Sequence, residues 1–242
     1  MKKTAVITGA SRGIGRAAAL LFAENGYDLA LCCRHNANLL QQTANQARQL
    51  GAVCLTYTGD MGVPDSCAGF FKEIDDTFSS IDVLINNAGI SITGLFQDMT
   101  QEEWQRILSS NLSSVFYMSQ QAVRRMLPRH QGCIVNVSSV WGSVGASCEV
   151  AYSAVKGAVN SMTRALAKEL APSHIRVNAA AFGAIDTDMN HFLDEEERRA
   201  LCEEIPMGRM GTPQEAAVLL LQLCQSPDYL TGQIVTMDGG WI

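Results

Sequence analysis

A tyrosine and a lysine four residues apart, Tyr152 and Lys156, offer the clearest chemistry in this sequence. Val155 and Val159 continue a helical apolar pattern around them, so the phenol and the ammonium are expected to project from one face of a helix. A free tyrosine has a pKa of about 10. A cation held beside the phenol favours the phenolate, so the pair predicts a tyrosine that can act as an acid–base group near neutral pH.

Ser139 is the third residue of this chemistry. It lies thirteen residues before Tyr152 and directly follows the apolar run 134–137, which predicts a buried strand. A hydroxyl at the carboxyl end of a strand can meet the start of the next helix and donate a hydrogen bond to a substrate oxygen. The spacing of Tyr152 and Lys156 alone is also typical of a surface helix whose side chains are neighbours by accident, so the surrounding motifs decide between the two interpretations.

A glycine-rich loop near the start of the chain predicts a phosphate site. The strand-like run 5–7 precedes the loop and the helix-forming run 16–23 follows it. Small residues let the backbone approach a pyrophosphate, and a helix N-terminus offers free N–H groups and positive potential. The spacing from Gly9 to Gly15 is G-x-x-x-G-x-G, which differs from the general dinucleotide fingerprint. Glycines also form ordinary turns, so the loop is informative mainly because a first strand precedes it.

The expected second strand, residues 29–33, ends at a basic residue, Arg34. Dinucleotide folds selective for NAD carry an acidic residue at this place, which binds the ribose 2′-hydroxyl. Arg34, with Arg12 in the glycine loop, suits a 2′-phosphate instead, because guanidinium groups make bidentate, charge-assisted bonds with phosphates. The sequence therefore favours NADPH/NADP+ over NADH, with two solvated surface arginines as the alternative.

The rest of the chain alternates between apolar runs and amphipathic helices. Further strands are expected at 53–57, 83–85, 175–180 and 234–237, and helices at 64–78, 104–126 and 214–224. This alternation predicts an α/β fold with a doubly wound parallel sheet (a Rossmann fold) of about seven strands and helices on both faces. Because no linker, repeat or charge block interrupts residues 1–242, we expect a single domain.

Composition argues against several classes of protein. The net charge of −6 disfavours a nucleic-acid partner, which usually meets a basic face. No run approaches the ~18–20 apolar residues that span a bilayer, and the apolar run behind Lys2 and Lys3 stops at Gly9, too short for export. The eight cysteines and four histidines show no metal-ligand spacing. We therefore expect a cytoplasmic protein with reduced cysteines, no metal and no membrane partner.

Four motifs together resemble the short-chain dehydrogenase/reductase family over essentially the whole chain. They are the glycine loop 8–15, Asn86-Asn87-Ala88-Gly89 after the fourth strand, Asn111 inside a long helix, and the set of Ser139, Tyr152 and Lys156. The resemblance implies a carbonyl reductase in which hydride passes from the nicotinamide to a ketone carbon. Tyr152 would donate a proton to the ketone oxygen, which Ser139 orients. Lys156 would lower the pKa of the tyrosine and bind the nicotinamide ribose, and Asn111 would complete a proton relay through water.

The resemblance also implies a set of cofactor contacts. They come from the glycine loop, the ends of the second, third and fourth strands, the acid–base pair and the segment after the sixth strand: Gly9, Ser11, Arg12, Gly13, Ile14, Gly15, Arg34, Asp60, Met61, Asn87, Ala88, Gly89, Tyr152, Lys156, Gly183, Ile185 and Thr187. The Asn87 turn can present amides to the cofactor or merely brace the sheet. Phe182 stands where family members usually have proline, and losing a proline frees the preceding backbone.

Two segments near the end of the chain carry further expectations. The charged segment 190–204 is either an ordinary solvated helix or a mobile lid over the substrate. The apolar end at Trp241 and Ile242 is unusual for a fraying terminus, and the resemblance implies that it packs against a sister subunit in a homotetramer.

The substrate stays open between two subgroups. Residues 205–211 and 111–116 are similar to 3-oxoacyl-[acyl-carrier-protein] reductases, whereas 141–150 looks like the bacterial reductases that act on 5-aminopentanone-modified elongation factor P. Ser173 stands where carrier-protein reductases often have a docking arginine. Both subgroups reduce a ketone on a flexible arm, so we expect acyl carrier protein or elongation factor P as the partner. A non-catalytic NADP(H)-binding sensor on the same fold is the alternative of another class, which the intact set of four residues disfavours.

Glu149, three residues before Tyr152, bears on this choice. Its side chain can face the substrate opening, where a carboxylate suits an acyl chain poorly, because desolvating it without a partner is costly. It would suit a substrate with an ammonium group near the ketone. The alternative is that Glu149 only caps the start of the helix, where a negative charge is favourable.

Overall fold

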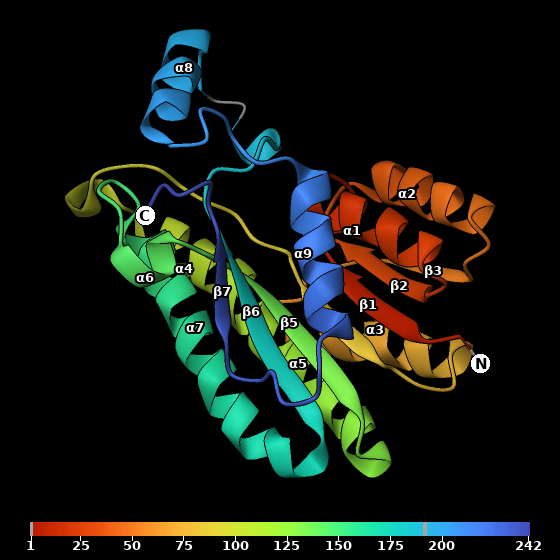
Figure 1. Cartoon of the computed structure of the whole chain (residues 1–242). Coiled ribbons are helices and arrows are strands. Elements are labelled where there is room, and N and C mark those ends of the chain that lie inside the picture. The colour runs from red at the N-terminus through yellow and green to blue at the C-terminus, as the bar shows by residue number, and fades with distance from the viewer. Residues whose placement is uncertain (1, 191–192) are drawn as a thin grey trace.

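The computed structural model describes residues 2–190 and 193–242, and within them seven parallel strands form one sheet in the order β3-β2-β1-β4-β5-β6-β7 (Figure 1). The strands are β1 Thr4–Thr8, β2 Asp28–Cys33, β3 Cys54–Thr58, β4 Val83–Asn86, β5 Gly132–Ser139, β6 Ile175–Phe182 and β7 Ile234–Met237. The order reverses at β1, whose neighbours are β2 and β4. The carboxyl ends of β1 and β4 therefore form the switch point at which such sheets bind ligands.

Helices cover both faces of the sheet, which confirms the predicted doubly wound α/β fold. One face carries α1 Gly13–Glu24, α2 Ala37–Gln49 and α9 Pro213–Gln225, and the other carries α3 Pro64–Thr77, α5 Ser114–Met126 and α7 Val150–Leu170. Successive side chains of a strand point to opposite faces. Accordingly Ala5 and Ile7 pack against the helices of the first face and Val6 packs against those of the second. Both sides of the strand are therefore buried, which explains its continuous run of apolar residues.

The helix expected over 104–126 runs without a break from Gln101 to Met126, but a π-helical turn interrupts its regular geometry around Asn111. It consists of α4 Gln101–Leu108, a π-helical turn η2 Ser109–Ser113, and α5. Asn111 lies in the π turn, and its Nδ2 donates to the carbonyl oxygens of Ile107 and Ile90, both at 3.0 Å. Its Oδ1 accepts from the Ile90 N–H at 3.1 Å. A side chain that competes for backbone hydrogen bonds in this way interrupts a regular helix.

Strand β6 runs two residues beyond its expected end at residue 180. Phe182 stays in the strand, in register with Ser139 of β5 and Met237 of β7. The Gly183 N–H then donates to the Met237 carbonyl at 3.0 Å. The missing proline thus leaves a paired strand end in place of a rigid turn.

The remaining helices lie around the carboxyl edge of the sheet or at the ends of longer elements. They are α6 Trp141–Val144, α8 Glu195–Glu204, and the short 3₁₀ turns η1 Phe96–Asp98, η3 Leu127–Arg129, η4 Ala171–Ser173 and η5 Asp188–Asn190. Helix α8 stands away from the sheet in Figure 1. Of the expected lid, residues 191 and 192 lie outside the described residues, and its mobility stays a prediction. Helix α2 was not anticipated.

Three further properties concern only the described ranges. No helix there is both long and apolar enough to cross a membrane. The eight cysteines are free thiols, five of them buried: Cys32, Cys33, Cys67, Cys133 and Cys224. No group of histidine, cysteine, aspartate and glutamate side chains in this part of the chain is arranged to hold a metal ion.

Candidate active site

A cavity of about 780 Å³ opens at the carboxyl edge of the sheet, within the usual size range of ligand sites. The glycine loop, the ends of β2, β5 and β6, the turn after β4 and helix α7 all contribute to its wall. Nearly every site residue predicted from the sequence lines it. The exceptions are Gly15 and Asn111, which lie behind the wall.

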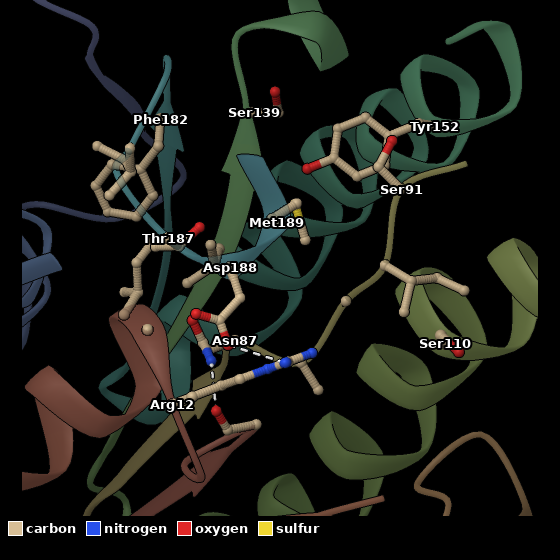
Figure 2. Close-up of a pocket in the computed structure, with 18 of the residues that line it drawn as sticks. Arg12, Asn87, Ser91, Ser110, Ser139, Tyr152, Phe182, Thr187, Asp188 and Met189 are labelled. Carbon is tan, nitrogen blue, oxygen red and sulfur yellow. Dashed lines mark hydrogen bonds and ion pairs between the residues drawn. The ribbon is translucent and has the colours of Figure 1, made fainter. Parts of the chain in front are cut away.

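The predicted acid–base pair lies in the wall formed by α7, with both side chains buried. Ser139, the last residue of β5, lies close enough to the Tyr152 hydroxyl to oppose the rise of its pKa, and Figure 2 shows both side chains in the same part of the view. Lys156 Nζ lies 5.5 Å from the centre of the Tyr152 ring and donates to the Val137 carbonyl oxygen at 2.8 Å. The packing of α7 on β5 therefore brings the serine at the end of the strand to the tyrosine and lysine of the helix.

The charge states of the pair follow from burial. Burial raises the pKa of Tyr152, the nearby charge of Glu149 raises it further, and the hydrogen bond with Ser139 opposes the rise. Burial also lowers the pKa of Lys156 to about 8. The prediction that Lys156 lowers the pKa of Tyr152 is not met in this arrangement, because the ammonium lies over the ring and binds the Val137 carbonyl. Tyr152 is thus a neutral phenol at neutral pH, which still holds the proton it would donate.

Asn111 lies between the turn after β4 and the acid–base pair. A Cβ on Gly89 would come within 2.6 Å of Asn111 Oδ1 and 3.7 Å of Lys156 Nζ. The turn can pass this close because position 89 has no side chain. The Asn111 side chain, completely buried, is fully occupied with the backbone of Ile90 and Ile107. In this arrangement it fixes the turn that carries Ile90.

The glycine loop fits a phosphate group. Gly9 has a φ of +68°, and a Cβ at Gly15 would overlap the Gly9 carbonyl oxygen, so both positions require glycine. Helix α1 begins at Gly13, and among the described residues the side chain of its N-cap, Arg12, makes no capping bond. The N–H groups of the first turn are therefore available to an anion. These features suit the pyrophosphate of a dinucleotide cofactor.

The turn after β4 braces this loop. The Asn87 and Ala88 N–H groups donate to Thr8 Oγ1 at 3.0 and 2.9 Å, and Asn87 Nδ2 donates to the Thr8 carbonyl at 2.9 Å. These donors are already engaged by the first strand. Of the two interpretations of the turn, the geometry favours bracing, although its residues also line the cavity.

The two predicted phosphate-binding arginines line the cavity, and each is paired with a carboxylate. Arg12 Nη1 lies 2.9 Å from Asp188 Oδ2, as Figure 2 shows, and Arg34 Nη2 lies 3.1 Å from Asp60 Oδ2. Their side chains are 58% and 43% exposed. Exposed pairs of this kind contribute little free energy, so both guanidinium groups can turn toward a phosphate at small cost.

Glu149 does not cap α7 through its side chain. It occupies the N-cap position, yet no described backbone N–H bonds to its carboxylate. Instead Glu149 Oε2 accepts a hydrogen bond from Ser91 Oγ at 2.6 Å, and both residues line the cavity. The Gly94 N–H also donates to the Cys148 carbonyl at 2.9 Å. The loop after β4 is thereby fastened to the segment before α7, next to Tyr152.

Several lining residues were not predicted as site residues: Ser91, Arg106, Ser110, Trp141, Met189, Leu193, Leu201 and Trp241. Ser91 follows the Asn87 turn directly, and Trp141 lies in a segment that the sequence had already singled out, so both could have been suspected from position. No local spacing indicates Arg106 or Trp241, which reach the cavity only through the packing of α4 and of the chain end.

Comparison with known proteins gives one family. The family model described as short chain dehydrogenase matches residues 3–198. An uncharacterized oxidoreductase of Bacillus subtilis, YmfI, is 39% identical over 100% of this chain and 99% of its own length. The 3-oxoacyl-[acyl-carrier-protein] reductase FabG of Vibrio cholerae is 37% identical, with 98% of this chain and 96% of its own covered.

Solved structures agree with this. A short-chain type dehydrogenase/reductase from Mycobacterium marinum superposes with a TM-score of 0.92 at 37% identity, with 99% of this chain and 95% of its own covered. YwfH, an NADPH-dependent reductase involved in bacilysin biosynthesis, superposes with a TM-score of 0.93 at 26% identity, with 100% and 99% covered.

Proposed function

The chain belongs to the short-chain dehydrogenase family of oxidoreductases, and we propose that it is an NADPH-dependent ketoreductase whose ketone is carried on a small protein. The observation that supports this most directly is the buried cluster of Ser139, Tyr152 and Lys156 in the wall of a cavity that also contains the glycine loop. One open space can thus hold a dinucleotide and a second reactant beside a proton donor.

In the proposed reaction the cofactor, when bound, supplies the hydride that reduces the ketone carbon. Ser139 donates a hydrogen bond that orients the ketone oxygen, and Tyr152 gives that oxygen its proton. Burial raises the pKa of Tyr152, so the phenol carries its proton at neutral pH, and a cation held near its oxygen would favour release of that proton. Lys156 would bind the nicotinamide ribose and replace the tyrosine's proton, with Asn111 holding the backbone through which a water relay runs.

NADPH is the proposed cofactor because two guanidinium groups border the cavity near the end of β2. Arg34 and Arg12 are both partly exposed, and each forms an exposed ion pair, with Asp60 and Asp188 respectively. Such pairs are weak enough to be exchanged for a phosphate. A 2′-phosphate would offer either arginine a charge-assisted, bidentate partner. The NADPH dependence of YwfH, a structural neighbour, points the same way.

For the substrate, a 3-oxoacyl group on an acyl carrier protein is the first candidate, supported by the FabG relatives. The 5-aminopentanone group of modified elongation factor P is the second. The contact that favours it is the pair of Ser91 and Glu149, which places a half-buried carboxylate beside Tyr152. An ammonium group on the substrate would find its counter-charge there. We further propose one cytoplasmic domain that assembles as a homotetramer.

The decisive experiment is a reductase assay on the purified protein, in which NADPH oxidation is followed with 3-oxoacyl carrier protein and with aminopentanone-modified elongation factor P. Turnover of one carrier well above the other selects the substrate. Cofactor binding without turnover of either carrier, or of simple ketones, would instead support a non-catalytic sensor and contradict the proposal.

A further inference from the structure

The last residues of the chain are folded back by two consecutive glycines. After β7, Gly239 and Gly240 have φ angles of +70° and +84°, a region that favours glycine. Asp238 holds the turn with both carboxylate oxygens, since Oδ1 accepts from the Gly240 N–H at 2.9 Å and Oδ2 from the Ile242 N–H at 3.0 Å. The chain end is therefore a built turn and not a loose terminus.

This turn is also fixed to its surroundings. The Met207 N–H donates to the Gly239 carbonyl at 3.2 Å, and a Cβ on Gly239 would come within 2.9 Å of Ile205 Cγ2. On the other side, a Cβ on Gly183 would come within 2.8 Å of Asp238 Cβ. The end of β6 and the segment after α8 thus hold the turn between them.

The turn places one indole ring against another at the cavity. Trp241 packs on Trp141 with ring centres 4.9 Å apart and planes at 62°, and both residues line the cavity. Edge-to-face pairs of this geometry are favourable beyond the area they bury. Ile242, one residue further, is 52% exposed, so the chain directs the tryptophan and not its last side chain to the cavity.

Trp141 connects this pair to the reacting groups. Its backbone N–H donates to Ser139 Oγ at 3.2 Å. The next residue, Gly142, presses on α7 so closely that a Cβ there would come within 2.8 Å of the Lys156 carbonyl carbon. Trp141 therefore lies on the short helix α6 that follows the Ser139 end of β5, and Trp241 packs on it beside the proposed site of the ketone.

We propose that Trp241, together with Trp141, forms the apolar wall of the substrate site and selects ketones that carry an apolar chain next to the carbonyl. The two rings would cover that chain and exclude water from the carbonyl, while Trp141 positions the Ser139 hydroxyl. The inference rests on the proposed reductase function. It deepens that function by assigning a specificity-determining residue to the end of the chain.

The test compares Trp241→Ala with Trp241→Phe and with Tyr229→Ala, a control that removes a fully exposed aromatic side chain outside the cavity wall. Burying one large apolar side chain contributes roughly 1.5–3 kcal/mol, so Trp241→Ala should lower kcat/KM for a ketone with a long alkyl chain by about tenfold or more. The loss should appear mainly in KM. A ketone with only a methyl group on each side should lose far less, and Trp241→Phe should recover most of the activity.

NADPH affinity, measured by fluorescence titration, should stay unchanged in all three variants. An equal loss for long and short ketones, or weakened NADPH binding, would mean that Trp241 only supports the fold and would overturn the proposal. Unchanged kinetics in Trp241→Ala would overturn it as well.

A readout that needs no turnover separates this proposal from the reductase function. The chain has three tryptophans, and Trp104, on α4, does not line the cavity. In a Trp104→Phe background, long-chain ketones should change the indole emission at concentrations where short ketones do not. If the enzyme turned over no ketone but the emission still changed, the reductase proposal would be contradicted. The proposal that Trp241 and Trp141 bind the apolar chain would be supported. Turnover without any emission change would contradict the wall alone.

Discussion

At the proposed cofactor end of the cavity, formed by the glycine loop and the turn at Asn87, backbone lies against backbone, whereas at the proposed substrate end, beside Tyr152, side chains from distant segments contact each other. A Cβ on Gly15 would overlap the Gly9 carbonyl oxygen and one on Gly9 would meet the turn at Asn87, and hydrogen bonds from Asn87 to Thr8 join the loop to that turn. The substrate end depends on two side-chain contacts, Ser91 with Glu149 and Trp141 with Trp241.

The contrast shows which part of the site can change without loss of the fold. Replacing a glycine at the cofactor end forces backbone to move, which disturbs the sheet edge itself. Replacing Glu149 or Trp241 removes one side-chain contact between segments outside the sheet and leaves the backbone of the strands unchanged. We therefore expect substitutions at the substrate end to alter selectivity, and those at the cofactor end to alter binding of every nucleotide or the fold.

Tyr152 lies between the two ends, and its substitution should have the largest effect. Tyr152→Phe keeps the ring and removes the hydroxyl, so turnover should fall by about 10²–10⁴, the usual contribution of a general acid. NADPH affinity should be retained, because the cofactor end is untouched. Steady-state kinetics and a fluorescence titration measure the two quantities. Near-full turnover in this variant would contradict the proposal that Tyr152 donates the proton.

Lys156 should make stability depend on pH. Its pKa is lowered to about 8 from an ordinary 10.5, so between these values the unfolded chain binds the extra proton and the folded chain does not. Stability should therefore rise with pH across this window, by up to about 3 kcal/mol relative to Lys156→Met, which cannot titrate. Denaturant unfolding of both proteins at pH 7.5 and pH 10 tests this. Parallel pH profiles for the two would contradict the lowered pKa.

Arg34 tests the cofactor end without moving its backbone. Arg34→Asp replaces attraction for a 2′-phosphate with repulsion, so NADPH binding should weaken by about tenfold or more while NADH binding changes little. Arg48→Asp, on the exposed part of α2 and outside the cavity wall, is a control for the change in net charge. If both cofactors weaken equally in Arg34→Asp, the arginine does not distinguish the phosphate.

Glu149 tests the substrate end in the same way. Glu149→Gln keeps the size of the side chain and its acceptance of the Ser91 hydrogen bond but removes the charge. It should lower kcat/KM about tenfold for a ketone with a nearby ammonium group and barely for a neutral ketone of equal length. Equal effects on the two ketones would make Glu149 a structural residue and favour the acyl carrier protein as partner. Ser91→Ala removes the hydrogen bond but keeps the charge, so it should leave the preference for the ammonium ketone in place.

Short-range patterns in the sequence were enough to predict the fold and the reacting groups, because both are encoded over short distances along the chain. Apolar runs of strand length mark the buried strands, glycine spacing marks the loop at Gly9, and a separation of four residues places Tyr152 and Lys156 on one helix face. Phe182, which stands where family members usually have proline, also predicted a changed backbone. The sequence did not predict that the strand would extend to include it.

How these parts meet in space depends on contacts between residues far apart in the chain, which the folded structure reveals. The π turn at Asn111 depends on an acceptor and a donor at Ile90, and the pairing of Arg12 with Asp188 joins residues 176 positions apart. The contact of Trp141 with Trp241 likewise requires the chain end to return across the sheet edge. Such contacts depend on how elements far apart in the chain pack together. The local pattern of apolar residues predicts single helices and strands but not these contacts.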